Sequence, residues 1–264
     1  MQLFKSVKIL HCAQNPLTRH ESELSHDAFR HRPQAEFSKE DIGVALDEVH
    51  ADAFIKYRDS DDQCAVLTSS GDKAFSVGAD IKDPPTDPDL WECMPGVGVI
   101  IDKQVIAAVA GYCVGGAYCL VQFCDLAIAA ENADFFYPEA QMGFCGGLIA
   151  STAARLPHKI AMEFMLTGRH FDAQRAYEVG MVNEVVPEGQ QVEAAMKYAR
   201  ILANSAPLVV GMIKRFVRDS VTPKGPSELH ALARRELLAI RSSDDQKEGG
   251  VAFREKRKPN FTGN

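Results

Sequence analysis

The sequence predicts an α/β core followed by an α-helical C-terminal part. Short apolar segments with the length of buried strands alternate with helical patterns over the first half of the chain, and from residue 149 onward the pattern is helical. Strands interleaved with helices and then a run of helices are typical of this class. The 264 residues, 46% of them hydrophobic, supply enough apolar material for a sizeable core in one domain or two.

The N-terminal third is the hardest part to assign. Residues 4–10 are compatible with a strand, and the polar, histidine-rich segment 19–32 is interpreted as a solvated loop. A helix is expected over 38–52, with Ser38 as its N-cap and apolar residues on one face. Four prolines within 83–96 predict a loop or a broken helix there.

Three apolar runs predict buried strands, over residues 65–68, 105–109 and 126–130. The stretch 105–130 is nearly uncharged and long enough to span a membrane. However, glycines interrupt its middle and Asp125 lies near its end. We therefore interpret it as two buried strands joined by a glycine-rich turn and a core helix, which begins at Gly115 and runs to about Phe123.

The second half of the chain predicts helices over 150–155, 159–166, 172–179, 191–203, 207–220 and 226–242. The net charge of −7 gives no support for nucleic-acid binding. Seven cysteines, an odd number without a CxxC pair, indicate reduced thiols and a cytoplasmic protein. No metal-ligand cluster and no dinucleotide fingerprint is found, so no metal or redox cofactor is expected.

Two glycine-containing turns follow predicted strands, at 75–82 and 111–117. Glycine lets the backbone approach a ligand closely, and free N–H groups at a strand end and a helix start can point at one oxygen atom. Two such donors would form an oxyanion hole for a carbonyl oxygen. Packing at a strand–turn–helix corner is the other explanation for these glycines, and the turns alone do not decide between the two.

Seven ordered segments carry a family resemblance. They are FSVGADIK at 75–82, KQVIAAVAGYCVGG at 103–116, CDLAIAAENADF at 124–135, Pro138-Glu139 with Gly143, LTGR at 166–169, GMVNEVVP at 180–187 and FREKRKPNF at 253–261. In this order and spacing they resemble the enoyl-CoA hydratase/isomerase, or crotonase-like, family. The resemblance covers roughly residues 60–264.

The resemblance implies a fold and an assembly. Residues 1–195 would form a spiral of ββα units, with residues 1–40 as a divergent N-terminal segment, and residues 196–264 a helical C-terminal region. In this family that region usually builds trimers, often paired as hexamers. The substrate would be an acyl-CoA thioester, with coenzyme A as part of the substrate rather than a cofactor.

The resemblance also assigns site residues. The backbone N–H groups of Ala79 and Gly116 would bind the thioester oxygen, and Glu139 would serve as acid and base. A glutamate beside an apolar pocket suits proton transfer near neutral pH, because burial disfavours its charged form. The expected contacts to substrate and coenzyme A come from Ala35, Val77, Gly78, Asp80, Ile81, Lys82, Cys119, Phe253 and Lys256, with Lys258 as a further phosphate candidate.

The sequence departs from the family pattern at two places. Cys119 stands where many hydratases carry a second glutamate, and a thiol replaces a carboxylate base only if its pKa is strongly perturbed. Residues 10–31 also differ from the usual N-terminal loop. Hydration, double-bond isomerisation and another acyl-CoA reaction such as hydrolysis therefore stay open. So does an acyl-CoA-binding or assembly protein that has lost catalysis.

Overall fold

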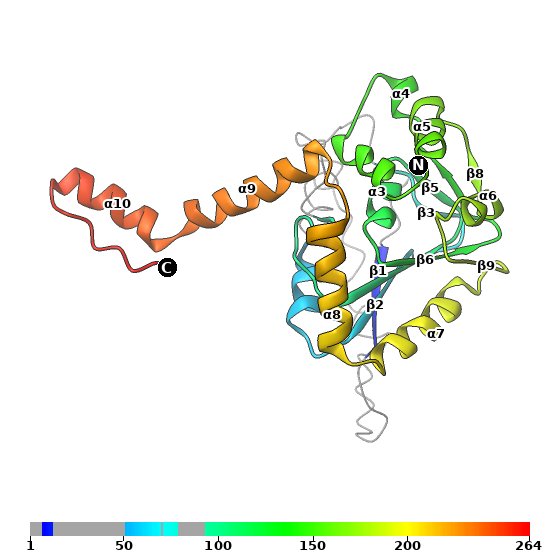
Figure 1. The fold of residues 1–264 in the computed structure, drawn as a ribbon, viewed down its shortest axis with the longest axis horizontal. Coiled ribbons are helices and arrows are strands. Elements are labelled where there is room, and N and C mark those ends of the chain that lie inside the picture. Colours follow the sequence, from blue (N-terminus) through cyan, green and yellow to red (C-terminus); the bar gives the residue numbers. More distant parts are fainter. Residues whose placement is uncertain (1–6, 13–50, 70, 79–92) are drawn as a thin grey trace.

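Two β-sheets form the centre of the molecule. The computed structural model describes residues 7–12, 51–69, 71–78 and 93–264 (Figure 1). The first sheet has the order β1-β2-β4-β6-β9 and is parallel except for β1; its strands are β1 (Val7–Cys12), β2 (Cys64–Ser69), β4 (Gln104–Val109), β6 (Leu126–Ala130) and β9 (Glu184–Val186). The second has the order β3-β5-β7-β8, with β8 antiparallel; its strands are β3 (Ala74–Ser76), β5 (Tyr112–Val114), β7 (Asp134–Phe136) and β8 (Phe171–Asp172).

The chain repeats a ββα pattern. A strand of the first sheet is followed by a short strand of the second sheet and then by a helix. This happens in β4, β5 and α3 (Gly116–Gln122), and again in β6, β7 and α4 (Glu139–Met142). The predicted α/β spiral of ββα units is therefore confirmed.

The first sheet is buried on both faces. Along β4, Val105, Ala107 and Val109 face the cluster that contains α3 and the second sheet. The intervening Ile106 and Ala108 face the cluster beneath α7 (Gln191–Ala203). Because successive side chains point to opposite faces, a strand covered on both sides has to be apolar throughout. This explains the uncharged run at 105–109.

Most of the described residues after β7 are helical. They are the 3₁₀-helix η2 (Gly147–Ala154), α5 (His158–Thr167), α6 (Ala173–Glu178), α8 (Pro207–Phe216) with the π-helical turn η3 (Val217–Val221), α9 (Pro226–Ser242) and α10 (Asp244–Glu255). Figure 1 shows α9 and α10 extending away from the body that holds both sheets. The helical C-terminal region is confirmed. The predicted division after residue 195 falls inside α7 and stays a prediction.

Some elements differ from the sequence predictions. Residues 51–59 are helical, so the predicted end of a helix at Asp52 is wrong, and Phe54 and Tyr57 within this segment are fully buried. The strands β5 and β7 to β9 have two or three residues each, too few to show an alternating pattern. The helix α10 was not predicted; the Ser243 hydroxyl caps it by accepting from the Gln246 N–H at 3.1 Å.

The remaining N-terminal expectations, over 13–50 and most of 83–96, lie outside the described residues. In the part of the chain that the structure describes, no helix combines the length and apolarity that a membrane crossing requires.

Candidate active site

The turn that carries Glu139 lies beside the glycines that follow β5. Strand β5 pairs with β7, placing Val114 opposite Phe136, and the Gly115 N–H donates to the Phe136 carbonyl at 3.1 Å. Two residues later Pro138 caps α4, and Glu139 is its first residue. The Glu139 carboxylate consequently lies directly over Gly115: a Cβ atom at Gly115 would stand 2.1 Å from Glu139 Oε1. Only glycine allows this approach.

The Glu139 carboxyl group is in a desolvated position. Its Oε2 atom is buried and has no hydrogen-bond partner among the described residues. Burial raises the pKa of Glu139 to about 7, and the hydrogen bond from its own backbone N–H acts weakly in the opposite direction. A carboxyl group with a pKa near neutrality can both accept and return a proton at physiological pH.

The two glycine turns that resemble an oxyanion hole lie next to each other. Strands β3 and β5 pair, and a Cβ atom at Gly78 would stand 3.8 Å from the Gly116 nitrogen. Gly116 is the first residue of α3, and no acceptor for its N–H is found in the described part of the chain. Ala79, the other predicted donor, lies outside the described residues, as do Ala35, Asp80, Ile81 and Lys82. Val77 and Gly78 lie at the edge of this site.

Cys119 lies on α3, one turn after Gly116, and is 5% exposed. Burial, followed by the negative charge of Glu139, raises the pKa of its thiol above the usual value. This is opposite to the change that a catalytic thiolate would need. Cys119 is therefore a small protonated group beside Glu139, in agreement with its interpretation as an apolar pocket residue.

Sequence reasoning missed Tyr137. It lies between Phe136 and Pro138, is only 3% exposed, and belongs to the same buried cluster as Cys119. No spacing signal marks a tyrosine at this position, and only its closeness to Glu139 in the chain could have drawn attention to it.

The predicted coenzyme A contacts from the C-terminus lie apart from Glu139. Phe253 is 86% exposed on α10, and Lys256 ends that helix in a left-handed conformation with φ of 54°. Both lie on the extension that projects from the body (Figure 1). The structure therefore does not bring them to the site of the same chain.

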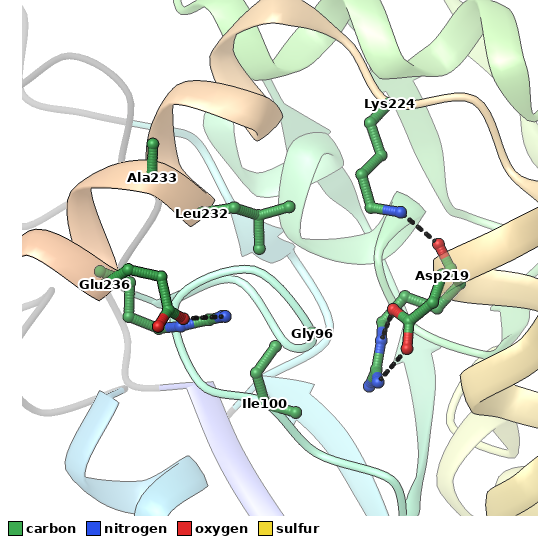
Figure 2. A pocket seen from close by; sticks show the side chains of 9 residues that line it. Gly96, Ile100, Asp219, Lys224, Leu232, Ala233 and Glu236 are labelled. Carbon is green, nitrogen blue, oxygen red and sulfur yellow. Dashed lines mark hydrogen bonds and ion pairs between the residues drawn. The ribbon is translucent and has the colours of Figure 1, made fainter.

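A cavity of about 430 Å³ lies elsewhere, where α9 leaves the body. Figure 2 shows Leu232 of α9 pointing into it, near Ile100 and across from Asp219 and Lys224. Its cations already have partners: Arg218 pairs with Asp102 and Asp219, Arg235 with Glu236, and Lys224 donates to the Arg218 carbonyl. No predicted site residue lines it. Among the described residues, no cluster of His, Cys, Asp or Glu could hold a metal ion.

A comparison with known protein families identifies the family of this chain. The family model described as enoyl-CoA hydratase/isomerase matches residues 44–264. This chain belongs to the enoyl-CoA hydratase/isomerase family. The prediction of an enzyme of the enoyl-CoA hydratase or isomerase type is confirmed at this level.

Similar proteins have names that are consistent with this family. The carnitinyl-CoA dehydratase of Salmonella typhimurium is 34% identical over 258 residues, which cover 88% of this chain and 92% of that protein. A solved carnitinyl-CoA hydratase from Mycobacterium avium is 35% identical with a TM-score of 0.62, over 83% of this chain and 89% of its own. An enoyl-CoA hydratase from Mycobacterium marinum is 31% identical with a TM-score of 0.59, over the same shares of the two chains.

Proposed function

We propose that this protein adds water to, or removes water from, an acyl-CoA thioester, with Glu139 as acid and base and the N–H groups of Ala79 and Gly116 as oxyanion hole. The observation that carries the proposal is the position of Glu139: its carboxyl group has a pKa of about 7 and lies over Gly115, next to the available N–H of Gly116. The similarity to proteins named carnitinyl-CoA dehydratase favours this reaction.

The proposed steps need one carboxyl group. The Glu139 carboxylate removes a proton from the α-carbon of a 3-hydroxyacyl-CoA, and the electron pair moves to the thioester oxygen, where two N–H groups stabilise the enolate. The enolate then expels the β-hydroxyl, which takes the proton back from Glu139 and leaves as water. The product is a 2-enoyl-CoA, and hydration is the reverse. Coenzyme A enters as part of the substrate, and no metal or redox cofactor takes part.

A second candidate is the isomerisation of a 3-enoyl-CoA to a 2-enoyl-CoA. Cys119 favours it, because a protonated thiol at this position leaves Glu139 as the carboxyl group that moves protons. In this reaction Glu139 removes a proton from the α-carbon and returns it to the γ-carbon, and no water is added.

The test is turnover of crotonyl-CoA, followed by the loss of the conjugated thioester absorbance. We expect Glu139→Gln to reduce the rate by about 100-fold or more, as the loss of a general acid–base group does. Glu178→Gln, which makes the same change at a half-exposed side chain on α6, is the matched control and should keep the wild-type rate. A wild type that binds the thioester but converts neither crotonyl-CoA nor a 3-enoyl-CoA would instead support an acyl-CoA-binding protein.

We also propose that copies of this chain assemble as a homotrimer or a hexamer. Exposed apolar side chains cover α8 and η3, among them Leu208 at 86%, Phe216 at 61% and Val221 at 69%. Such a surface is typical of a protein interface. In an assembly, the projecting α10 could bring Phe253 and Lys256 to coenzyme A bound by a neighbouring copy. The test is the mass in solution by light scattering, which Leu208→Asp should lower towards that of a monomer.

The cytoplasm is the proposed location. In the described part of the chain, Cys113, Cys119, Cys124 and Cys145 are free thiols, which supports a reducing compartment.

A further inference from the structure

The Tyr137 side chain points into the same buried region as Cys119. Phe135 and Tyr137 alternate with the less buried Phe136 along the end of β7, so both rings face the core. Because the Gly115 N–H is bonded to Phe136, the backbone holds Tyr137 in register with the glycine turn that starts α3.

The Tyr137 hydroxyl is only loosely engaged. It donates to the Gly146 carbonyl at 3.4 Å and accepts from the Gly146 N–H at 3.3 Å. Both distances are longer than usual, since O–H···O bonds in proteins are typically about 2.7–2.8 Å and N–H···O bonds about 2.9–3.0 Å. A ligand oxygen that offers a shorter hydrogen bond can therefore replace the contact to Gly146.

Glu139 follows Tyr137 by two residues, and Cys119 lies in the same buried cluster as Tyr137. Burial is the main cause that raises the pKa of Tyr137, and the charge of Glu139 and the thiol of Cys119 follow it. The phenol therefore stays protonated throughout the physiological range, and it is a donor rather than a base. Glu139 Oε2 is buried and has no hydrogen-bond partner among the described residues.

The proposed hydration leaves one requirement unmet. The oxygen that joins the β-carbon has to be held while Glu139 moves the proton, and Cys119 provides only a weak thiol donor. A neutral phenol in the buried cluster that holds Cys119, two residues before Glu139, can hold that oxygen by a hydrogen bond. It adds no second negative charge to the desolvated site.

We propose that Tyr137 is a further catalytic residue, whose hydroxyl donates a hydrogen bond to the oxygen that adds to, or leaves from, the β-carbon of the acyl-CoA. This inference rests on the proposed function of Glu139. In hydration, Glu139 takes one proton from water, the oxygen forms its bond to the β-carbon, and the double-bond electrons move to the thioester enolate. Glu139 then gives the proton to the α-carbon. Tyr137 keeps its own proton throughout.

The experiment measures two reactions of the full-length protein with Tyr137→Phe. The first is hydration of crotonyl-CoA. The second is exchange of the α-protons of butyryl-CoA in D₂O, which needs the enolate and Glu139 but no β-oxygen. The matched control is Tyr57→Phe, which removes another buried hydroxyl, one that donates to the Gln104 carbonyl at 2.7 Å far from the glycine turns.

We expect Tyr137→Phe to lower hydration by about 100-fold, as the loss of one donor to a reacting oxygen does, and to keep the exchange rate within about threefold. Tyr57→Phe should change neither rate. Hydration within about threefold of wild type, or an equal fall in both reactions, would overturn the role of Tyr137 and leave Glu139 in place. A wild-type protein that exchanges α-protons but does not hydrate crotonyl-CoA would also overturn the role of Tyr137 and leave Glu139 in place. A wild type without either reaction would refute the proposed function, and the role of Tyr137 with it.

Discussion

Gly115→Ala should disable the site through a single methyl group. The added Cβ would stand 2.1 Å from Glu139 Oε1, and an ordinary contact of 3.4 Å requires the carboxylate to retreat by about 1.3 Å. A displacement of about 1 Å at a reacting group can cost about 100-fold in rate. The backbone at Gly115, with φ of 60° and ψ of −121°, lies in a region that residues with a side chain rarely adopt, which also disfavours alanine by about 1–3 kcal/mol. We therefore expect a loss of about 100-fold in crotonyl-CoA turnover together with a modest loss of stability.

Gly180→Ala separates the two effects. Gly180 has φ of 77° and no atom within 4 Å of its would-be Cβ, so alanine meets the strain of a positive φ there without touching another group. Both variants should lose free energy of unfolding in urea, but Gly180→Ala should keep the wild-type rate. If Gly115→Ala also turns over crotonyl-CoA within about threefold of wild type, the placement of Glu139 over Gly115 does not control the reaction.

Three further predictions concern stability. Folding raises the pKa of Glu139 from 4.5 to about 7, so between these two pH values the folded state holds a proton that the unfolded state has lost. The stability gained from binding this proton is complete below the unfolded pKa of 4.5. It disappears as the pH rises through the folded pKa of about 7. Glu139→Gln should therefore raise the melting temperature at about pH 8 but hardly at about pH 5, and equal shifts at both would contradict this. Asp125→Asn should cost about 1–3 kcal/mol in urea unfolding, because Asp125 binds both the Val105 N–H and Lys214 of α8 at 2.7 Å; an unchanged midpoint would refute it. Phe164→Ala, which empties a fully buried position between two aromatic rings, should cost about 3–5 kcal/mol by the same measurement, and a loss below about 1 kcal/mol would show that the site collapses.

The parts of the fold that the sequence predicted are those with strong local patterns. The strand at 105–109 was recognisable because a parallel sheet covered on both faces requires an unbroken apolar run. The second sheet was not, because its strands are held by pairing to neighbours distant in sequence and are too short for any period to show. The helix α10 was not predicted, because Gly249 and Gly250 lie in its middle and lower its intrinsic helix propensity.

In the candidate site too, the motif residues could be predicted from the sequence, whereas properties that depend on packing could not. Glu139 and Gly116 were found through their motifs, and the position of the Glu139 carboxylate over Gly115 agrees with them. The raised pKa of Glu139 comes from burial, which only the packing around it reveals. Tyr137 was overlooked because what distinguishes it is the direction of its ring and the loose engagement of its hydroxyl.

The projecting C-terminal helices have a consequence for the dynamics of the molecule. In α9 only Glu228 and Ala231 are buried, both in its first two turns, and in α10 only Ala252 is. Beyond Ala231, the contacts among the described residues are few: Arg235 donates to the Val97 carbonyl at 2.9 Å, and in the tail Arg257 pairs with Glu248. The two helices have 17 and 12 residues, and isolated helices of about this length are only marginally stable in water. Their amide protons should therefore exchange with solvent long before those of the sheets, and slow down as rising protein concentration gives them a surface to pack on.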